Sequence, residues 1–136
     1  MVVAEIMTKD PMTVDAAARI RDVISSLFEL DVRHIPVVEG RELVGIISDR
    51  DLRGFLAPAL VELEKPSDVA AKLNQPISTV MSSDVLSVDP ETELSEVVEL
   101  MLDHKVGAIP VVDPDSSELV GIVSYMDVLR AAQDSF

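Results

Sequence analysis

The strongest constraint on the fold is that the chain contains two copies of one sequence pattern. The run Ile35-Pro36-Val37-Val38 recurs 74 residues later as Ile109-Pro110-Val111-Val112. The run Leu43-Val44-Gly45-Ile46 recurs 76 residues later as Leu119-Val120-Gly121-Ile122. The two additional residues fall in a stretch of Asp, Pro and Ser, where an insertion costs little free energy. The repeat predicts two copies of one supersecondary unit, over 1–53 and 80–136, joined by a linker over 54–79.

Each copy shows the same elements in the same order. A short extended segment (12–14 and 86–88) leads to Asp15 or Asp89, which we expect to N-cap the next helix. Apolar residues at helical spacing follow over 20–27 and 94–101. Two short β-branched runs then predict two strands, and a final helix is expected to start at Ser48 or Ser124. The predicted order is therefore β-α-β-β-α, twice.

The length of the chain limits how these copies can be stabilised. The chain has 136 residues, 48% of them hydrophobic but only 3% aromatic, so the core must be aliphatic. One copy of about 50 residues would bury too little surface to be comfortably stable alone. We therefore predict a mixed α/β fold (α+β-like) in which the two copies pack against each other around a pseudo-two-fold axis.

Composition excludes several classes of protein. With no cysteine and two histidines, disulfides, a Cys nucleophile and a His-rich zinc site are disfavoured. The formal net charge of −14 repels a phosphate backbone, which argues against nucleic-acid binding. No apolar run is long enough for a membrane span, and the first residues lack the features of a signal peptide. We expect a cytoplasmic protein with no nucleic-acid or membrane partner. No catalytic motif is evident, so we expect no enzyme activity.

The repeated motifs carry a resemblance to a known family. Paired I-P-V-V runs, each followed by L-V-G-I-[IV]-S-x-x-D at the start of a helix, resemble tandem CBS (cystathionine β-synthase) domains. The resemblance covers nearly the whole chain and implies a CBS pair, often called a Bateman module. In that family the two copies leave two related clefts that often bind AMP, ADP, ATP or S-adenosylmethionine. The modules commonly form homodimers and regulate an enzyme, channel or transporter.

The resemblance also implies which residues of this chain bind a ligand. The S-x-x-D motif would place the Asp on ribose hydroxyls and the Ser on phosphate, and the early-strand residues against the base bound across the pseudo-dyad. One site would combine Ser48, Asp51, Ser87, Val88 and Thr92. The other would combine Ser124, Asp127, Thr13, Val14 and Ala18. The residues before the I-P run would reach phosphate: these are Arg33 and His34 in the first copy, but Gly107 and Ala108 in the second.

The S-x-x-D motif has a structural interpretation beside the functional one. A Ser three residues before an acid at a helix start forms a capping box, which satisfies free helix N–H groups. The two interpretations are compatible, because a helix N-terminus binds phosphate and an Asp there can accept hydrogen bonds from a vicinal diol.

Charge is distributed unevenly over the two copies. Residues 1–53 carry ten acidic and seven basic residues, whereas 80–136 carry twelve acidic residues and only Lys105 and Arg130. An anionic ligand would therefore find its cations in the first copy, where Arg33 and Arg50 are best placed for bidentate phosphate binding. If His34 lies near a phosphate, affinity would fall as pH rises through its pKa. Otherwise His34 is a half-buried packing residue.

Three functions remain open from the sequence. The leading hypothesis is a regulatory module that binds an adenine nucleotide, either alone or together with Mg²⁺. This module would form a homodimer and regulate an unidentified partner protein. The alternative is a structural dimerisation module with empty clefts. The third is a small hydrolase or transferase on the same scaffold. Gly45 and Gly121 favour close packing within the sheet over contact with a ligand.

Overall fold

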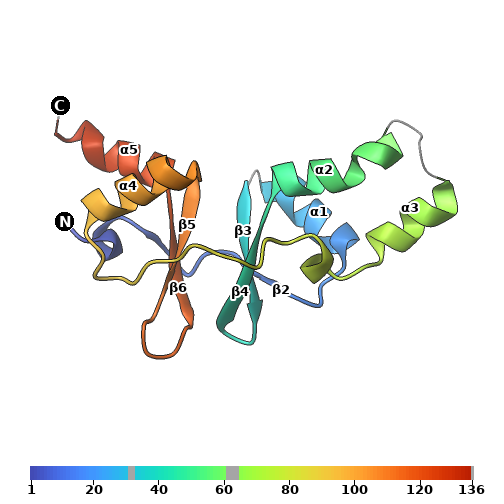
Figure 1. The fold of residues 1–136 in the computed structure, drawn as a ribbon, viewed down its shortest axis with the longest axis horizontal. Helices are drawn as coiled ribbons and strands as arrows, with labels where there is room; N and C mark the ends of the chain where they lie inside the picture. Colours follow the sequence, from blue (N-terminus) through green and yellow to red (C-terminus); the bar gives the residue numbers. More distant parts are fainter. Residues whose placement is uncertain (31–32, 61–64, 136) are drawn as a thin grey trace. The chain divides into compact units, whose positions relative to one another are not determined.

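The computed structural model describes residues 1–30, 33–60 and 65–135, which form five α-helices and two three-stranded sheets (Figure 1). These residues divide into two compact units. The first comprises Met1–Pro11, Arg41–Leu43 and Leu86–Phe136, and the second comprises Met12–Gly40 and Val44–Val85. The mixed α/β class predicted from the repeat is confirmed.

The first unit is built on a sheet of order β1-β6-β5. Strands β5 (Ala108–Val112) and β6 (Leu119–Ser124) are antiparallel, and β1 (Thr8–Lys9) pairs antiparallel with β6. Helix α5 (Tyr125–Gln133) follows β6 directly and lies beside α4 (Leu94–His104) (Figure 1). The buried core is aliphatic, as the composition predicts: Val3, Val88, Val97, Met101, Ile109, Val111 and Val123.

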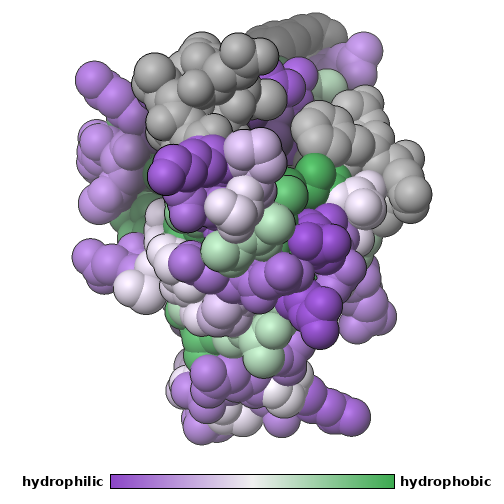
Figure 2. Space-filling model, turned by 90° about the vertical axis from the view of Figure 1, so that its right-hand side faces the viewer, coloured by the Kyte–Doolittle hydropathy of each residue, from purple (hydrophilic) through white to green (hydrophobic). Residues whose placement is uncertain are grey.

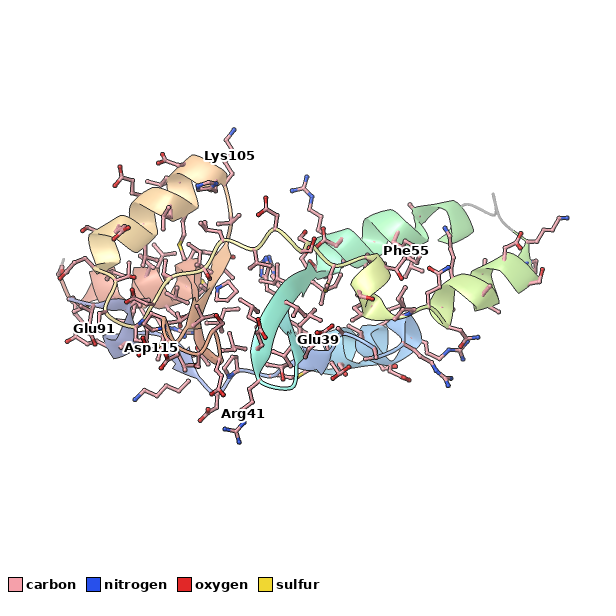
Figure 3. The ribbon with its side chains drawn as sticks, turned by 60° about the horizontal axis from the view of Figure 1, so that its bottom comes forward. Glu39, Arg41, Phe55, Glu91, Lys105 and Asp115 are labelled. Carbon is pink, nitrogen blue, oxygen red and sulfur yellow. The ribbon has the colours of Figure 1, made fainter. Side chains whose placement is uncertain are left out.

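Helix α4 shows how local sequence sets an element. Its buried residues Val97 and Met101 are four residues apart, which places both on the face toward the core. The helix ends because Lys105 adopts a left-handed conformation with φ 55° and donates its N–H to the Met101 carbonyl. The Lys105 side chain points away from the unit at this end of α4 (Figure 3).

The second unit is built on a sheet of order β2-β3-β4. Strand β2 (Val14–Asp15) runs parallel to β3 (His34–Glu39), with Val14 opposite Val37. Strand β4 (Glu42–Ser48) follows β3 after a two-residue turn in which Gly40 has φ 64°, so these strands are antiparallel. Helices α1 (Ile20–Leu30) and α2 (Asp49–Leu60) complete the repeated pattern. The core contains Ala16, Ile20, Val23, Ile35, Val37, Ile47, Leu52 and Ile77.

The expected N-caps of α1 and α4 are wrong. Helix α1 starts at Ile20 and helix α4 at Leu94, five residues beyond Asp15 and Asp89, respectively. Asp15 Oδ1 instead accepts the N–H of Ala17 (2.8 Å), and Asp89 Oδ1 accepts the N–H of Glu91 (2.7 Å). An Asp that bonds the backbone two residues on forms an Asx turn, which competes with the cap for the same side chain.

The segment that leads into each sequence copy, residues 1–11 for the first and 77–85 for the second, belongs to the unit of the other copy; we call these two the lead segments. In the first unit, Thr8 lies opposite Ile122, and a Cβ on Gly121 would lie 2.6 Å from Met7 Sδ. In the second unit, Ser82 bridges Ile46, and a Cβ on Gly45 would collide with Met81. Both glycines are required by close packing, as their sequence context predicts. The ranges 1–53, 54–79 and 80–136 describe the sequence repeat and stay a prediction as domain boundaries.

The predicted linker is partly helical. Helix α2 continues past residue 53 to Leu60, and α3 spans Pro66–Leu73. The sequence also allows a helix over 59–65 between two prolines, and residues 61–64 of this range lie outside the described residues. The ammonium of Lys72 on α3 lies 4.9 Å from the ring centroid of Phe55 on α2. Helix α3 has no buried residue, and the face of the molecule at this end is largely hydrophilic (Figure 2).

Candidate functional site

The Ser48–Asp51 motif forms a capping box at the start of α2. Ser48 Oγ accepts the N–H of Asp51 at 3.0 Å, and Asp51 Oδ2 accepts the N–H of Ser48 at 3.2 Å. Both side chains are half-buried. Within the described residues no hydrogen bond reaches Asp51 Oδ1, so this oxygen keeps its accepting capacity beside the helix N-terminus.

The Ser124–Asp127 motif forms the equivalent box at the start of α5. Asp127 Oδ2 accepts from Ser124 N (2.9 Å) and Ser124 Oγ (3.1 Å), and Ser124 Oγ accepts from Asp127 N (3.3 Å). The second oxygen differs from that of Asp51, because Asp127 Oδ1 lies 3.9 Å from Arg130 Nη1. The first copy has Gly54 in the place of Arg130.

Each helix start is also held by the residue that precedes β3 or β5. Asp49 N donates to the Arg33 carbonyl at 3.1 Å, and Tyr125 N donates to the Gly107 carbonyl at 3.0 Å. In each helix, the capping Ser accepts a hydrogen bond from the N–H of the third helical residue. Among the described residues, the N–H of the second helical residue (Arg50 in α2, Met126 in α5) makes no protein hydrogen bond. It is available to an anion at the positive end of the helix dipole.

The predicted cations lie around the first box. The bond from Asp49 N to the Arg33 carbonyl places residue 33 at the start of α2, and Arg50 is the second residue of that helix. Both residues are exposed. The ion pair that α2 makes within its first turns uses Arg53, whose Nη2 lies 3.8 Å from Asp49 Oδ2. Neither Arg33 nor Arg50 makes an ion pair within the described residues.

His34 begins β3 and is half-buried beside the first box. Burial lowers the pKa of His34 below its ordinary value of 6.5, against the opposing fields of Asp49 and Asp51 and with a further small contribution from Arg33. The imidazole is therefore neutral at pH 7, so it contributes hydrogen bonding and not charge to a ligand at that pH.

The early-strand residues, which the family resemblance places against the base of a ligand, lie at the edges of both sheets. Val14 pairs with β3 in the second unit, where Thr13 is exposed and the Ala18 carbonyl accepts the N–H of Ile77. In the first unit Val88 bridges Val111 and is buried, and Ser87 is exposed. Thr92 is half-buried there, and its carbonyl accepts the N–H of Val3.

The structure brings Ser48 and Asp51 together with Arg33, His34 and Arg50, and it brings Ser124 together with Asp127. The combination of either box with the early-strand residues of the other copy stays a prediction.

Two features of the structure are not among the predictions made from the sequence. The Arg130–Asp127 pair is one, although its spacing of three residues on a helix could have predicted it. The other is a groove of about 370 Å³ in the first unit, which contains none of the predicted site residues; it is lined by Met1, Leu94, Ser95, Val98, Val128, Ala131, Ala132 and Ser135. Among the described residues, no group of three or more His, Asp or Glu is arranged to hold a metal ion.

Comparison with known proteins establishes the class to which this chain belongs. The CBS domain family model matches residues 3–58 and 77–134, so the chain is a member of the CBS domain family and carries two CBS domains in tandem. It is similar to the CBS domain-containing protein YhcV of Bacillus subtilis, with 32% identity over 126 residues that cover 93% of this chain and 81% of YhcV.

Two solved structures share the fold over nearly the whole chain. CBSX2 of Arabidopsis thaliana, in complex with AMP, has a TM-score of 0.83 and 29% identity and covers 98% of this chain and 97% of its own. The CBS domain pair of protein MJ0100, in complex with 5′-methylthioadenosine and S-adenosyl-L-methionine, has a TM-score of 0.76 and 26% identity, with 96% and 98% covered.

Other curated relatives are much longer than this chain. It spans 47% of protein MJ1225 of Methanocaldococcus jannaschii, at 27% identity over 132 residues. Comparable shares hold for the next two relatives, at 43% and 40% of their length. Among the residues that the structure describes, no helix is long and apolar enough to cross a membrane.

Proposed function

We propose that this chain is a regulatory module that binds an adenine nucleotide of the AMP, ADP or ATP class at its Ser-x-x-Asp boxes and dimerises. The observation that carries the proposal is the geometry of Asp51. One carboxylate oxygen is fixed by the backbone of Ser48, and the other is available. A fixed carboxylate beside an available helix N–H suits a ribose diol next to a phosphate.

The comparisons support the ligand class. CBSX2 and the MJ0100 domain pair share this fold at 29% and 26% identity, and their complexes hold AMP and two adenosyl compounds. The shared chemical group of these ligands is adenosine. Mg²⁺ would enter only with the phosphates of a bound nucleotide, because a hard cation prefers their oxygens. The module would regulate a partner protein and catalyse no reaction itself.

Thermal unfolding tests the proposal directly. The Tm of the chain is measured in the presence of AMP, ADP, ATP, S-adenosylmethionine or NADH, each with and without Mg²⁺. A ligand at 100 times its Kd adds about 2.7 kcal/mol to the free energy of unfolding, which raises the Tm by several degrees. Asp51→Ala and Asp127→Ala should reduce this shift while the variants remain folded. An unchanged shift in both variants would refute the assignment of the boxes.

A second candidate function has its own observation. Large apolar side chains are exposed on α4 and α5, including Leu102 (72%) and Leu129 (57%). Such residues mark interaction surfaces when they gather on one face. They favour a structural dimerisation module, in which the boxes serve only as helix caps. A stable dimer that no nucleotide stabilises would support this alternative.

A further inference from the structure

The two boxes have the same backbone geometry but different charges around them. In the first copy, Arg33 and Arg50 stand beside the helix start. Their counterparts in the second copy are Gly107 and Met126, and Gly54 of the first copy is replaced by Arg130. Within the described residues, the two exposed arginines beside the first box thus have uncharged counterparts at the second. Of the cations that the second copy carries near its box, Lys105 points away from the unit, and Arg130 is paired with the Asp of its own box.

We propose that the two boxes bind ligands of different charge. The box at α2 binds an adenine nucleotide through its phosphate, and the box at α5 binds an adenosyl ligand whose 5′ substituent carries no negative charge. This inference rests on the proposed function, and it assigns a distinct ligand class to each box.

The α2 box can bind a phosphate strongly. Arg33 and Arg50 are exposed and make no ion pair within the described residues, so their guanidinium groups are available for bidentate contacts. The N–H of Arg50 adds a backbone donor at the positive end of the helix dipole. These groups outweigh the carboxylates of Asp49 and Asp51, because Asp49 is already paired with Arg53.

The α5 box lacks this attraction. Residues 86–136 carry eleven acidic residues against Lys105 and Arg130, so an added phosphate would meet a net negative field. The exposed residues that begin α5 are Tyr125 and Met126, which present apolar surface instead of guanidinium groups. A thioether suits such a surface, and a sulfonium is additionally attracted by the field.

The Arg130–Asp127 pair reinforces the difference. Arg130 lies 3.9 Å from Asp127 Oδ1 and shares the carboxylate that a ribose diol would use. A guanidinium held by this carboxylate is less available to a phosphate. The α5 box therefore discriminates by the contacts of the adenosine group and not by phosphate charge.

Isothermal titration with AMP and 5′-methylthioadenosine tests the proposal in variants that retain one box. Asp127→Ala leaves the α2 box, and AMP should bind there at least tenfold more tightly than methylthioadenosine, the factor that one charge-assisted hydrogen bond supplies. Asp51→Ala leaves the α5 box, where the preference should reverse. Higher salt should weaken AMP binding at the α2 box, because exposed guanidinium groups are screened.

Exchange of the charged residues provides the matched control. In the Asp127→Ala background, R33G/R50M should reduce the ratio of AMP to methylthioadenosine affinity at least tenfold. In the Asp51→Ala background, G107R/M126R should raise that ratio by a similar factor. Gly107 has no positive φ, so Arg can adopt its backbone conformation. If the double variant unfolds by circular dichroism, M126R alone makes the same test, because Met126 is 45% exposed.

The outcomes separate this inference from the proposed function. If neither Asp51→Ala nor Asp127→Ala changes any titration, the boxes are not the sites and the proposed function fails. Binding can instead map to the boxes while the ratio of AMP to methylthioadenosine affinity agrees within threefold between them and does not change in R33G/R50M or G107R/M126R. In that case the proposed function survives. The division of ligand classes is then wrong.

Discussion

A Cβ atom placed on Gly121 would lie 2.6 Å from Sδ of Met7, and Gly45 has the same relationship to Met81. In both cases a backbone carbonyl, that of Thr8 or Ser82, stands only 3.0 Å away. A methionine can change rotamer, but a backbone carbonyl within a strand pairing cannot move as freely. Each glycine thus allows a lead segment to lie against the last strand of its unit.

This contact predicts the effect of adding a methyl group. Gly121→Ala and Gly45→Ala should each lower the free energy of unfolding by about 1–3 kcal/mol, the usual cost of overpacking. Gly54→Ala is the matched control, since a Cβ at Gly54 meets nothing within 4 Å and the residue lies inside α2. That variant should gain up to about 1 kcal/mol from helix propensity. Urea unfolding measures all three, and equal effects of Gly121→Ala and Gly54→Ala would contradict the packing argument.

The exchange of lead segments predicts where a core mutation is felt. Val3 and Ile77 are fully buried, Val3 in the first unit and Ile77 in the second. Val3→Ala should therefore accelerate amide hydrogen exchange in α4 and β6, although residue 3 belongs to the first sequence copy. Ile77→Ala should accelerate exchange in α1 and β3. The reverse pattern, with Val3→Ala acting on β3, would show that the lead segments are not exchanged.

The half-buried imidazole of His34 predicts a dependence of stability on pH. Burial lowers the pKa of His34 in the folded chain below 6.5, so the unfolded chain binds more protons in the window just under that value. The contribution of His34 is fully present above pH 6.5 and is lost as pH falls through the window toward the lowered pKa. His34→Gln should flatten this part of the stability profile, measured by urea unfolding at about pH 5 to 7.

The control for His34→Gln removes the other imidazole. His104 is exposed at the end of α4, and His104→Gln tests whether loss of any histidine has the same effect. An unchanged slope in His34→Gln would mean that other groups set the dependence in this range.

The exposed apolar residues of α5 lead to a prediction about the proposed dimer. Leu129 is 57% exposed, and its counterpart in the first copy is the charged residue Arg53. If α5 contributes to self-association, Leu129→Ser should raise the dissociation constant of the dimer at least tenfold, since burial of a leucine contributes about 1.5–3 kcal/mol. Sedimentation velocity over a concentration series measures this constant. Arg53→Ser is the control, and an equal effect in both variants would exclude a specific role of α5.

Most of the fold could be predicted because its signals are local. The β-branched runs before Ser48 and Ser124 form strands, and both serines cap the helices that follow. The caps expected at Asp15 and Asp89 were wrong, because an Asx turn and an N-cap use the same side chain and the sequence does not distinguish them.

The pairing of distant segments is harder to predict from the sequence. The lead segments of both copies read as short apolar stretches, and their periodicity does not specify which strand they join. The site shows the same limit. The Ser-x-x-Asp boxes follow from spacing alone, and the spacing of Asp127 and Arg130 on α5 could also have predicted their pair. By contrast, no local pattern specifies that Asp49 N donates to the Arg33 carbonyl, a contact between residues 16 positions apart.

The exchange of lead segments also limits how this chain can be divided. A cut in the segment between α2 and α3 would separate residues 1–11 from the sheet that they complete. It would also separate residues 77–85, which include Ile77, from the rest of the core that Ile77 joins. Neither fragment would contain all the strands and core residues of one unit. The two halves of this chain would thus depend on each other to fold, because each supplies a segment that completes the core of the other.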